Sequence, residues 1–77
     1  TLINAHVANS KKADYVNDKV ITTEIERIEK EFDGRGRVVI RPSGTEPLVR
    51  VMIEGDNEGE TKKEAEGLAA LIEKRLS

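Results

Sequence analysis

The sequence has no cysteine and very few aromatic residues, and both absences exclude classes of function. With 0 cysteines, the chain can form no disulfide framework, no thiolate nucleophile and no zinc site built on cysteine. Tyr15 and Phe32 are its only aromatic residues, so the hydrophobic core must be aliphatic. The same scarcity leaves no row of rings on which the bases of a single-stranded nucleic acid would stack.

Long apolar runs and an excess of positive charge are also missing. No segment approaches the roughly 20 apolar residues of a membrane span, and no signal-peptide pattern opens the chain. The formal net charge is −2, which argues against a general surface for nucleic acid or membrane. We therefore expect no nucleic-acid partner, no membrane partner and a cytoplasmic location.

The residues that are present suffice for one small globular domain. Hydrophobic and charged residues each make up 36% of the 77 residues, a balance typical of globular proteins. A chain of this length builds one modest core, whose stability is marginal without neighbouring domains. Because the chain opens at Thr1 with strand-like sequence and no initiator methionine, we interpret residues 1–77 as a piece of a longer protein.

The charge is distributed unevenly along the chain. Residues 34–50 contain four arginines and one glutamate, a net charge of +3. The remaining residues therefore carry −5, which gives the overall −2. An anion that approaches the molecule would be attracted to residues 34–50 and repelled elsewhere.

Alternation of apolar and polar residues predicts three strands, over residues 2–7, 37–41 and 48–54. Residues 9–18 are mostly polar and predict a loop with a single helical turn. With the two helices described next, the order is strand–helix–strand–strand–helix. This order predicts an α+β domain, with a small, mostly antiparallel sheet and both helices packed on one face.

Both helices are predicted from amphipathic stripes of apolar residues. Asn17 or Asp18 would cap the first helix, and residues 33–34, Asp-Gly, would end it. Residues 61–64 have the spacing of a capping box and predict that the second helix opens there, after a short polar turn. Gly67, inside the second helix, is expected to allow close packing on the sheet. The stripes are Ile21, Ile25, Ile28 and Phe32 in the first helix, and Ala65, Leu68, Ala69, Ile72 and Leu76 in the second.

The segment RPSGTEPLVR, residues 41–50, combines the features of a phosphate-binding loop. Ser43 and Thr45 offer hydroxyl donors, and Gly44 lets the backbone turn so that successive N–H groups point at one anion. A proline near each end fixes φ there. These residue types also make an ordinary hairpin turn, which is the alternative interpretation.

Arg41 and Arg50 bracket the loop, and guanidinium groups suit phosphate oxygens because they present paired donors and stay charged. Each arginine alternates with apolar residues of its strand. If both apolar faces cover the same core, the two arginines leave the sheet together on its opposite face. Glu46 is interpreted as pairing with a neighbouring arginine; a contact with substrate hydroxyls or an amino group is the alternative.

The remaining polar residues are interpreted as solvated. His6 is a lone histidine on the polar face of a strand, with no nucleophile to pair with. Asp56, Glu58 and Glu60 lack the spacing of a calcium loop and lie before a helix, where the macrodipole favours acids. Dinucleotide and Walker patterns are absent. We expect no metal site and no catalytic residue in this segment.

The stretch RVVIRPSGTEPLVRVMIEG, residues 37–55, resembles the C-terminal domain of the α-D-phosphohexomutase superfamily. That domain carries a phosphate-binding loop of the type R-x-S-G/N-T-x-P. The continuation LVRVMIEG is most similar to the bacterial phosphoglucosamine mutase branch of this superfamily. The resemblance implies that residues 1–77 are a single C-terminal phosphate-binding domain of a longer, multidomain enzyme, with a fold like that of the TATA-box-binding protein. It also implies that Arg41, Ser43, Gly44, Thr45 and Arg50 hold the phosphate of a sugar phosphate, with Glu46 as a supporting residue.

For the parent enzyme, the resemblance implies interconversion of glucosamine 6-phosphate and glucosamine 1-phosphate, toward UDP-N-acetylglucosamine and the cell wall. That chemistry uses a phosphoserine, Mg²⁺ and a bisphosphorylated sugar intermediate, and the resemblance allows a homodimeric parent. The phosphoserine and metal motifs of the family do not occur in this chain, so the isolated segment is expected to be inactive. Two alternatives are the same domain of a phosphomannomutase/phosphoglucomutase and a stand-alone, non-enzymatic anion-binding module.

Overall fold

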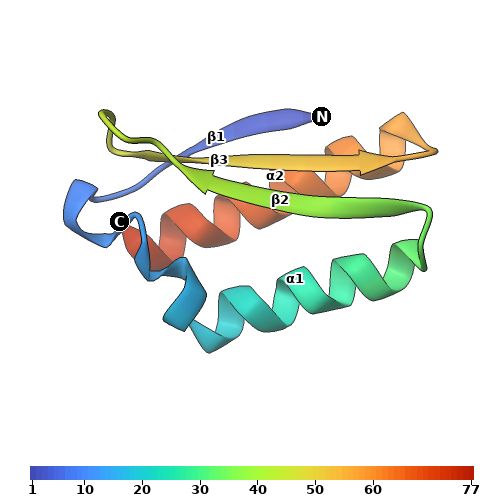
Figure 1. Cartoon of the computed structure of the whole chain (residues 1–77), viewed down its shortest axis with the longest axis horizontal. Coiled ribbons are helices and arrows are strands. Elements are labelled where there is room, and N and C mark those ends of the chain that lie inside the picture. Colours follow the sequence, from blue (N-terminus) through green and yellow to red (C-terminus); the bar gives the residue numbers. More distant parts are fainter.

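Alternating apolar residues build three strands, and amphipathic stripes build two α-helices that cover one face of the resulting sheet (Figure 1). The computed structural model describes all residues 1–77. The elements in chain order are β1 (Leu2–His6), the short 3₁₀ helices η1 (Asn9–Lys11) and η2 (Asp14–Asn17), α1 (Lys19–Phe32), β2 (Gly36–Pro42), β3 (Leu48–Gly55) and α2 (Glu58–Leu76).

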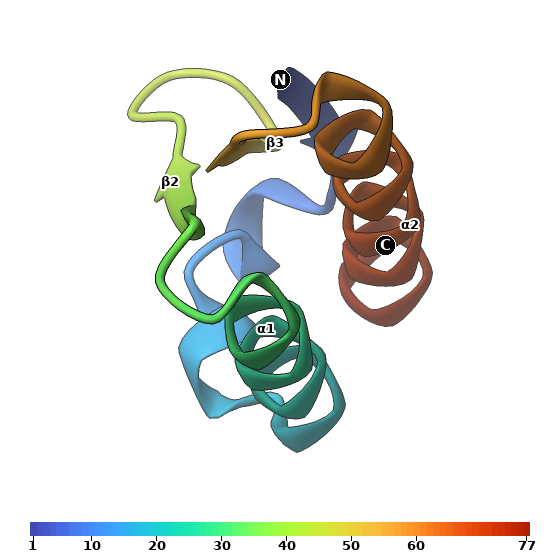
Figure 2. The same ribbon diagram turned by 90° about the vertical axis from the view of Figure 1, so that its right-hand side faces the viewer.

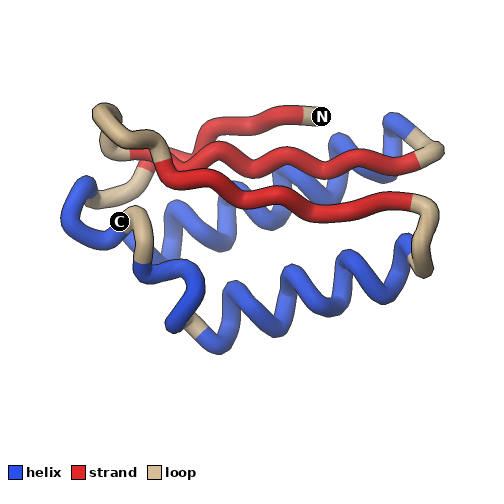
Figure 3. The backbone as a smooth tube through the Cα atoms, viewed as in Figure 1, coloured by secondary structure: helices blue, strands red, loops and turns tan.

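The sheet has the order β1-β3-β2, so the last strand in sequence lies in the middle and pairs antiparallel with both others. The strands form one layer (Figure 3), and the end-on view shows both helices on the same side of that layer (Figure 2). The predicted α+β architecture is therefore confirmed, with a fully antiparallel sheet. Its other face is left open. Neither α1 nor α2 has an apolar stretch of the length that a bilayer crossing requires.

The core lies between the sheet and the two helices and is mostly aliphatic, as the composition predicts. Every second residue of β3 points into it, and the predicted stripes of both helices face it. Burying these side chains away from water is the main favourable contribution to folding. The core consists of Ala5, Val7, Ile21, Ile28, Phe32, Val49, Val51, Ile53, Ala65, Leu68, Ala69, Ile72 and Leu76.

The ends of α1 follow the sequence prediction. The Asp18 carboxylate accepts hydrogen bonds from the backbone N–H groups of Val20 (3.0 Å) and Ile21 (3.1 Å) and so caps the first turn. At the other end Asp33 has φ 48° and Gly34 has φ 84°, a left-handed conformation that reverses the chain into β2. Between β1 and α1 the structure contains η1 and η2 in place of the single helical turn that was expected.

The predicted start of the second helix was wrong. Helix α2 begins at Glu58, and Asn57 is its N-cap, accepting a hydrogen bond from the Glu60 N–H at 2.9 Å. Asn57 and Glu60 have the same capping-box spacing as the pattern that opens at Thr61, and Asn is a stronger N-cap than Thr. Thr61 instead lies within the first turn, buried, with its hydroxyl donating to the Glu58 carbonyl at 3.0 Å.

Two glycines differ in what they do for packing. Gly67 is exposed, and a Cβ added there would meet nothing within 4 Å, so the expectation that it allows close packing on the sheet was wrong. Gly36 is the glycine that a close approach requires: a Cβ there would lie 2.2 Å from the backbone oxygen of Glu54. That contact places the start of β2 tightly against β3 and so helps to set the register of the hairpin.

Candidate functional site

The candidate phosphate loop, residues 43–47, joins the adjacent strands β2 and β3. A backbone hydrogen bond from Ser43 N to the Leu48 carbonyl (3.0 Å) closes its base. Ser43 is 8% exposed, and its Oγ accepts hydrogen bonds from the N–H groups of Thr45 (3.3 Å) and Glu46 (3.1 Å). Ser43 therefore organises the turn, while its hydroxyl proton is still available to donate.

This arrangement changes the predicted use of the loop amides. The N–H groups of Thr45 and Glu46 both donate to Ser43 Oγ, so in this structure neither is free to donate to an anion. The Gly44 N–H donates to no protein acceptor, and Gly44 and Thr45 are exposed. In this conformation the donors that remain for an anion are the Gly44 amide and the hydroxyls of Ser43 and Thr45.

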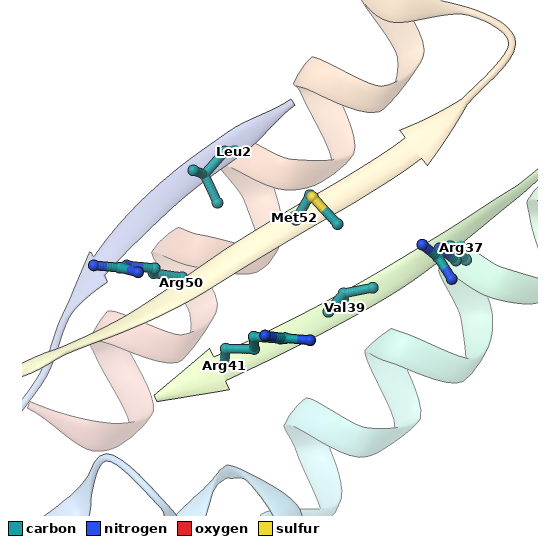
Figure 4. A pocket seen from close by; sticks show the side chains of 6 residues that line it. All are labelled: Leu2, Arg37, Val39, Arg41, Arg50 and Met52. Carbon is teal, nitrogen blue, oxygen red and sulfur yellow. The ribbon is translucent and has the colours of Figure 1, made fainter. Parts of the chain in front are cut away.

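Arg41 and Arg50 lie directly opposite each other, on the neighbouring strands β2 and β3. Both are exposed on the open face of the sheet, as the alternation of β2 and β3 predicts. Their guanidinium groups point in opposite directions, that of Arg41 along β2 and that of Arg50 toward β1 (Figure 4). Like charges directly opposite each other destabilise a strand pair, so this position carries a cost that the fold alone does not explain.

The other arginines are neutralised by carboxylates. Arg35 pairs with Asp56 at 3.0 Å, and Arg37 pairs with its cross-strand neighbour Glu54 at 2.8 Å. The four paired arginines are Arg27, Arg35, Arg37 and Arg75. Of the six arginines in the sequence, only the two beside the loop form no ion pair, so the uncompensated guanidinium charge is confined to that end of the sheet.

The open face beside these arginines is a shallow groove across the three strands (Figure 4). Leu2, Met52 and Val39 are successive cross-strand neighbours and form an apolar row. Asn4, Arg50 and Arg41 form the next row toward the loop. The loop end of the groove is therefore cationic, and its middle is apolar.

Glu46 does not pair with an arginine, so that interpretation was wrong. Its carboxylate is exposed and forms no ion pair, while Arg41 extends along β2 (Figure 4). What Glu46 contributes to the protein is its backbone carbonyl, which accepts hydrogen bonds from Leu48 N (2.8 Å) and from Lys12 Nζ (3.4 Å). Nothing in the sequence singles out Lys12, because a lysine in a polar segment carries no signal that it will reach a distant loop.

The remaining candidates are His6, which pairs with Leu48 next to the loop, and the acids near the start of α2. The His6 side chain is exposed, as predicted, and its backbone N–H donates to Glu73 Oε2 at 2.8 Å. Glu58 and Glu60 lie in the first turn of α2, where the helix dipole favours negative charge. The chain places no group of three or more His, Cys, Asp or Glu side chains where they could hold a metal ion.

The fold and the loop together define a small α+β domain with a hairpin loop at one end of its sheet, flanked by two arginines that form no ion pair. Residues 2–71 match the family described as "Phosphoglucomutase/phosphomannomutase, C-terminal domain". The chain therefore belongs to the phosphoglucomutase/phosphomannomutase family and corresponds to its C-terminal domain.

Curated relatives with similar sequences are phosphoglucosamine mutases from bacteria. The enzyme of Clostridium botulinum (strain Loch Maree / Type A3) is 60% identical over 75 residues, which are 97% of this chain and 17% of that protein. Those of Caldicellulosiruptor bescii and Clostridium acetobutylicum are 59% and 58% identical over 76 residues, 99% of this chain and 17% of each relative. The chain thus spans about 17% of the length of the relatives it matches.

Proposed function

We propose that this chain is the substrate-phosphate-binding domain of a phosphoglucosamine mutase, and that it holds the phosphate that is not reacting while glucosamine 6-phosphate and glucosamine 1-phosphate interconvert. Three observations support this: the family match over residues 2–71, the relatives of 57–60% identity that are named phosphoglucosamine mutases, and the geometry of the loop. The proposed binding residues are Arg41, Ser43, Gly44, Thr45 and Arg50.

The observation that carries the proposal is the pair of uncompensated arginines on either side of the loop. Arg41 and Arg50 face each other across β2 and β3 without a carboxylate between them. A phosphate dianion placed beside both would convert a repulsive pair into two charge-assisted interactions. Because the guanidinium groups diverge in the free domain, we expect at least one of them to turn toward the loop when the anion binds.

The loop supplies short-range donors to complement this charge. Gly44 would donate its N–H, and Ser43 and Thr45 would donate their hydroxyl protons. Ser43 holds the turn through two accepted hydrogen bonds, so the donors are ordered before the anion arrives. Because these donors are already ordered, less conformational entropy is lost when the anion binds. For Glu46, the contact with substrate hydroxyls or an amino group remains the alternative we retain.

The chemical contribution of such a domain is positioning. Phosphoryl transfer requires the reacting hydroxyl to be aligned with the phosphorylated residue of the enzyme, and holding the far phosphate supplies that alignment. Binding energy gained far from the reaction thus lowers the barrier at the reacting end. In this proposal the Mg²⁺, the phosphoserine and contacts to a bisphosphorylated intermediate belong to the rest of a cytoplasmic parent.

The alternatives have less support. The family also includes phosphomannomutases and phosphoglucomutases, but the relatives cited above are named phosphoglucosamine mutases. A stand-alone anion-binding module is less well supported because the matched relatives are longer enzymes, of which this chain spans about 17%. We therefore retain the mutase domain as the proposal.

Titration of the 77-residue chain with inorganic phosphate, followed by ¹H–¹⁵N NMR, tests the proposal. Only part of the natural site is present, so we expect a Kd near the millimolar range, about −4 kcal/mol. The Ser43, Gly44 and Thr45 amides should shift first, and Arg41→Ala should weaken binding. Arg37→Ala, which removes the same charge from the same strand and face, is the control and should change Kd much less. Shifts confined to the helices, or equal losses in both variants, would contradict the proposal.

A further inference from the structure

The segment that follows β1 contacts the phosphate loop at two points. The backbone N–H of Val7 donates to the Pro47 carbonyl at 3.0 Å, and Lys12 Nζ donates to the Glu46 carbonyl at 3.4 Å. Figure 1 shows this segment and the loop between β2 and β3 at the same end of the molecule. Residues far apart in sequence thus meet at the loop, and one of them brings a positive charge.

Lys12 differs from every other lysine of the chain in its burial. The sequence has seven lysines, and Lys12 alone is only half-exposed; the other six are exposed. It forms no ion pair with a carboxylate. Its hydrogen bond to Glu46 is exposed, so the ammonium stays in contact with water and within reach of an anion, as expected of a lysine that buries only part of its stem.

The chemistry of the ammonium group leaves room for a ligand. An ammonium carries three donors and no acceptor, and the structure accounts for one of them, on Glu46. The other two have no protein acceptor. The neighbouring Lys11 reaches a different place: its Nζ lies 3.5 Å from the Ser77 carbonyl, at the end of α2.

We propose that Lys12 is a third cationic binding residue of the phosphate site, supplied by the segment between β1 and α1 and lying outside the loop motif. It deepens the proposed function and rests on it. In the free domain the ammonium holds the Glu46 carbonyl, and when a phosphate group occupies the loop it donates to a phosphate oxygen. The anion is thereby approached by Arg41 and Arg50 from the sheet and by Lys12 from the adjoining segment.

The chain offers a matched control in Lys11. Inorganic phosphate is titrated into the unmodified chain, Lys12→Met and Lys11→Met, with Kd measured from the Gly44 and Thr45 amide shifts. Both variants lose one positive charge one residue apart, but only Lys12 contacts the loop. Lys12→Met should weaken binding about threefold to fivefold, the effect of one partly exposed charge. Lys11→Met should change Kd less than twofold, and the difference should shrink at high salt.

Two further variants separate binding by charge from support of the loop. Lys12→Gln keeps an N–H donor for Glu46 but has no charge, and Lys12→Arg keeps the charge. The proposal expects Lys12→Gln to bind as weakly as Lys12→Met, and Lys12→Arg to recover at least half of the lost affinity. Full recovery by Gln, or equal Kd values for Lys12→Met and Lys11→Met, would overturn it. Absence of any loop shift in the unmodified chain would overturn the proposed function itself.

Discussion

At the scale of single residues, the pair formed by Arg41 and Arg50 is the feature most in need of explanation. Two rows further along the same strands, Arg37 faces Glu54 and forms an ion pair. The same hairpin thus contains a favourable and an unfavourable cross-strand charge pair on one face. A site that binds an anion accounts for the second, because a residue selected for a ligand need not stabilise the free fold.

Replacing Arg50 by glutamate should stabilise the free domain and remove phosphate binding. Arg50→Glu would face Arg41 as Glu54 faces Arg37, and such cross-strand pairs contribute about 0.2–1 kcal/mol. Urea unfolding at low salt measures the change in the free energy of unfolding. The converse variant Glu54→Arg creates a second pair of facing arginines and should destabilise the domain by a similar amount. Destabilisation by Arg50→Glu would show that the present pair carries no cost.

Some features of individual residues in the candidate site could be predicted from the sequence, and others could not. The orientation of Arg41 and Arg50 followed from alternation in two strands, because side-chain direction has a period of two residues. The partner of Glu46 could not be predicted in this way, because the direction of its side chain depends on the conformation of a short loop. The sequence predicted that the Ser43 hydroxyl donates to the ligand. It did not predict that the same oxygen accepts hydrogen bonds from Thr45 and Glu46, because those bonds depend on the conformation of the loop. Lys12 gave no signal at all.

At the scale of elements, α1 depends on Asp18 for its first turn and for its link to α2. Arg75, near the end of α2, donates to Asp18 Oδ2 at 3.0 Å. Partial burial acts to raise the pKa of Asp18, but the hydrogen bond and charge of Arg75 and the N–H groups of Ile21 and Val20 outweigh it, and the pKa lies below its usual 3.8. A carboxylate with a lowered pKa stabilises the folded state where it is ionised.

The contribution of Asp18 should therefore depend on pH. It is fully present above about pH 4, where the unfolded carboxyl is also ionised, and is lost as the pH falls through the lower pKa of the folded state. Asp18→Asn keeps an N-cap but removes the charge. This variant should be less stable than the unmodified chain at pH 7, and the difference in stability should disappear in acid. Asp14→Asn, at an exposed carboxylate with no ion pair, is the control. Thermal unfolding from pH 2 to 7 measures both, and a pH-independent difference for Asp18→Asn would contradict the assignment.

Element types were predictable here and some element boundaries were not. The strands and helices follow from clear periodicity, and α1 has only one pair of adjacent cap candidates. The start of α2 offers two consecutive capping boxes, one opening at Asn57 and one at Thr61. The residues between these two positions are polar and glycine, so no apolar periodicity indicated that they belong to the helix. The inward orientation of Thr61 decides between the two boxes. The solvent-facing position of Gly67 follows from the same stripe that places Ala65 and Leu68 in the core.

At the scale of the whole molecule, the sheet separates a face that forms the core from an open face that carries the candidate site. Both helices and the core lie on one side. On the open side, the two guanidinium groups without a carboxylate partner lie beside a loop with free donors. The acidic remainder of the chain adds a field that favours approach of an anion at this end. The site thus results from strand pairing, which brings together residues that are nine apart in sequence.

The steady-state kinetics of Arg41→Ala in a full-length enzyme that contains this domain test the proposed role of the loop. Each charge-assisted hydrogen bond contributes about 1.5–3 kcal/mol, so kcat/KM for both sugar phosphates should fall about 10- to 100-fold. Arg41→Lys should recover only part of the loss, because a point charge does not reproduce a bidentate fork. Arg37→Ala is the control variant and should change kcat/KM little. Arg41→Ala should also leave unchanged the phosphorylation of the serine that we propose in another domain. Unchanged kcat/KM in folded Arg41→Ala would contradict a phosphate-holding role and leave residues 43–47 as an ordinary hairpin turn.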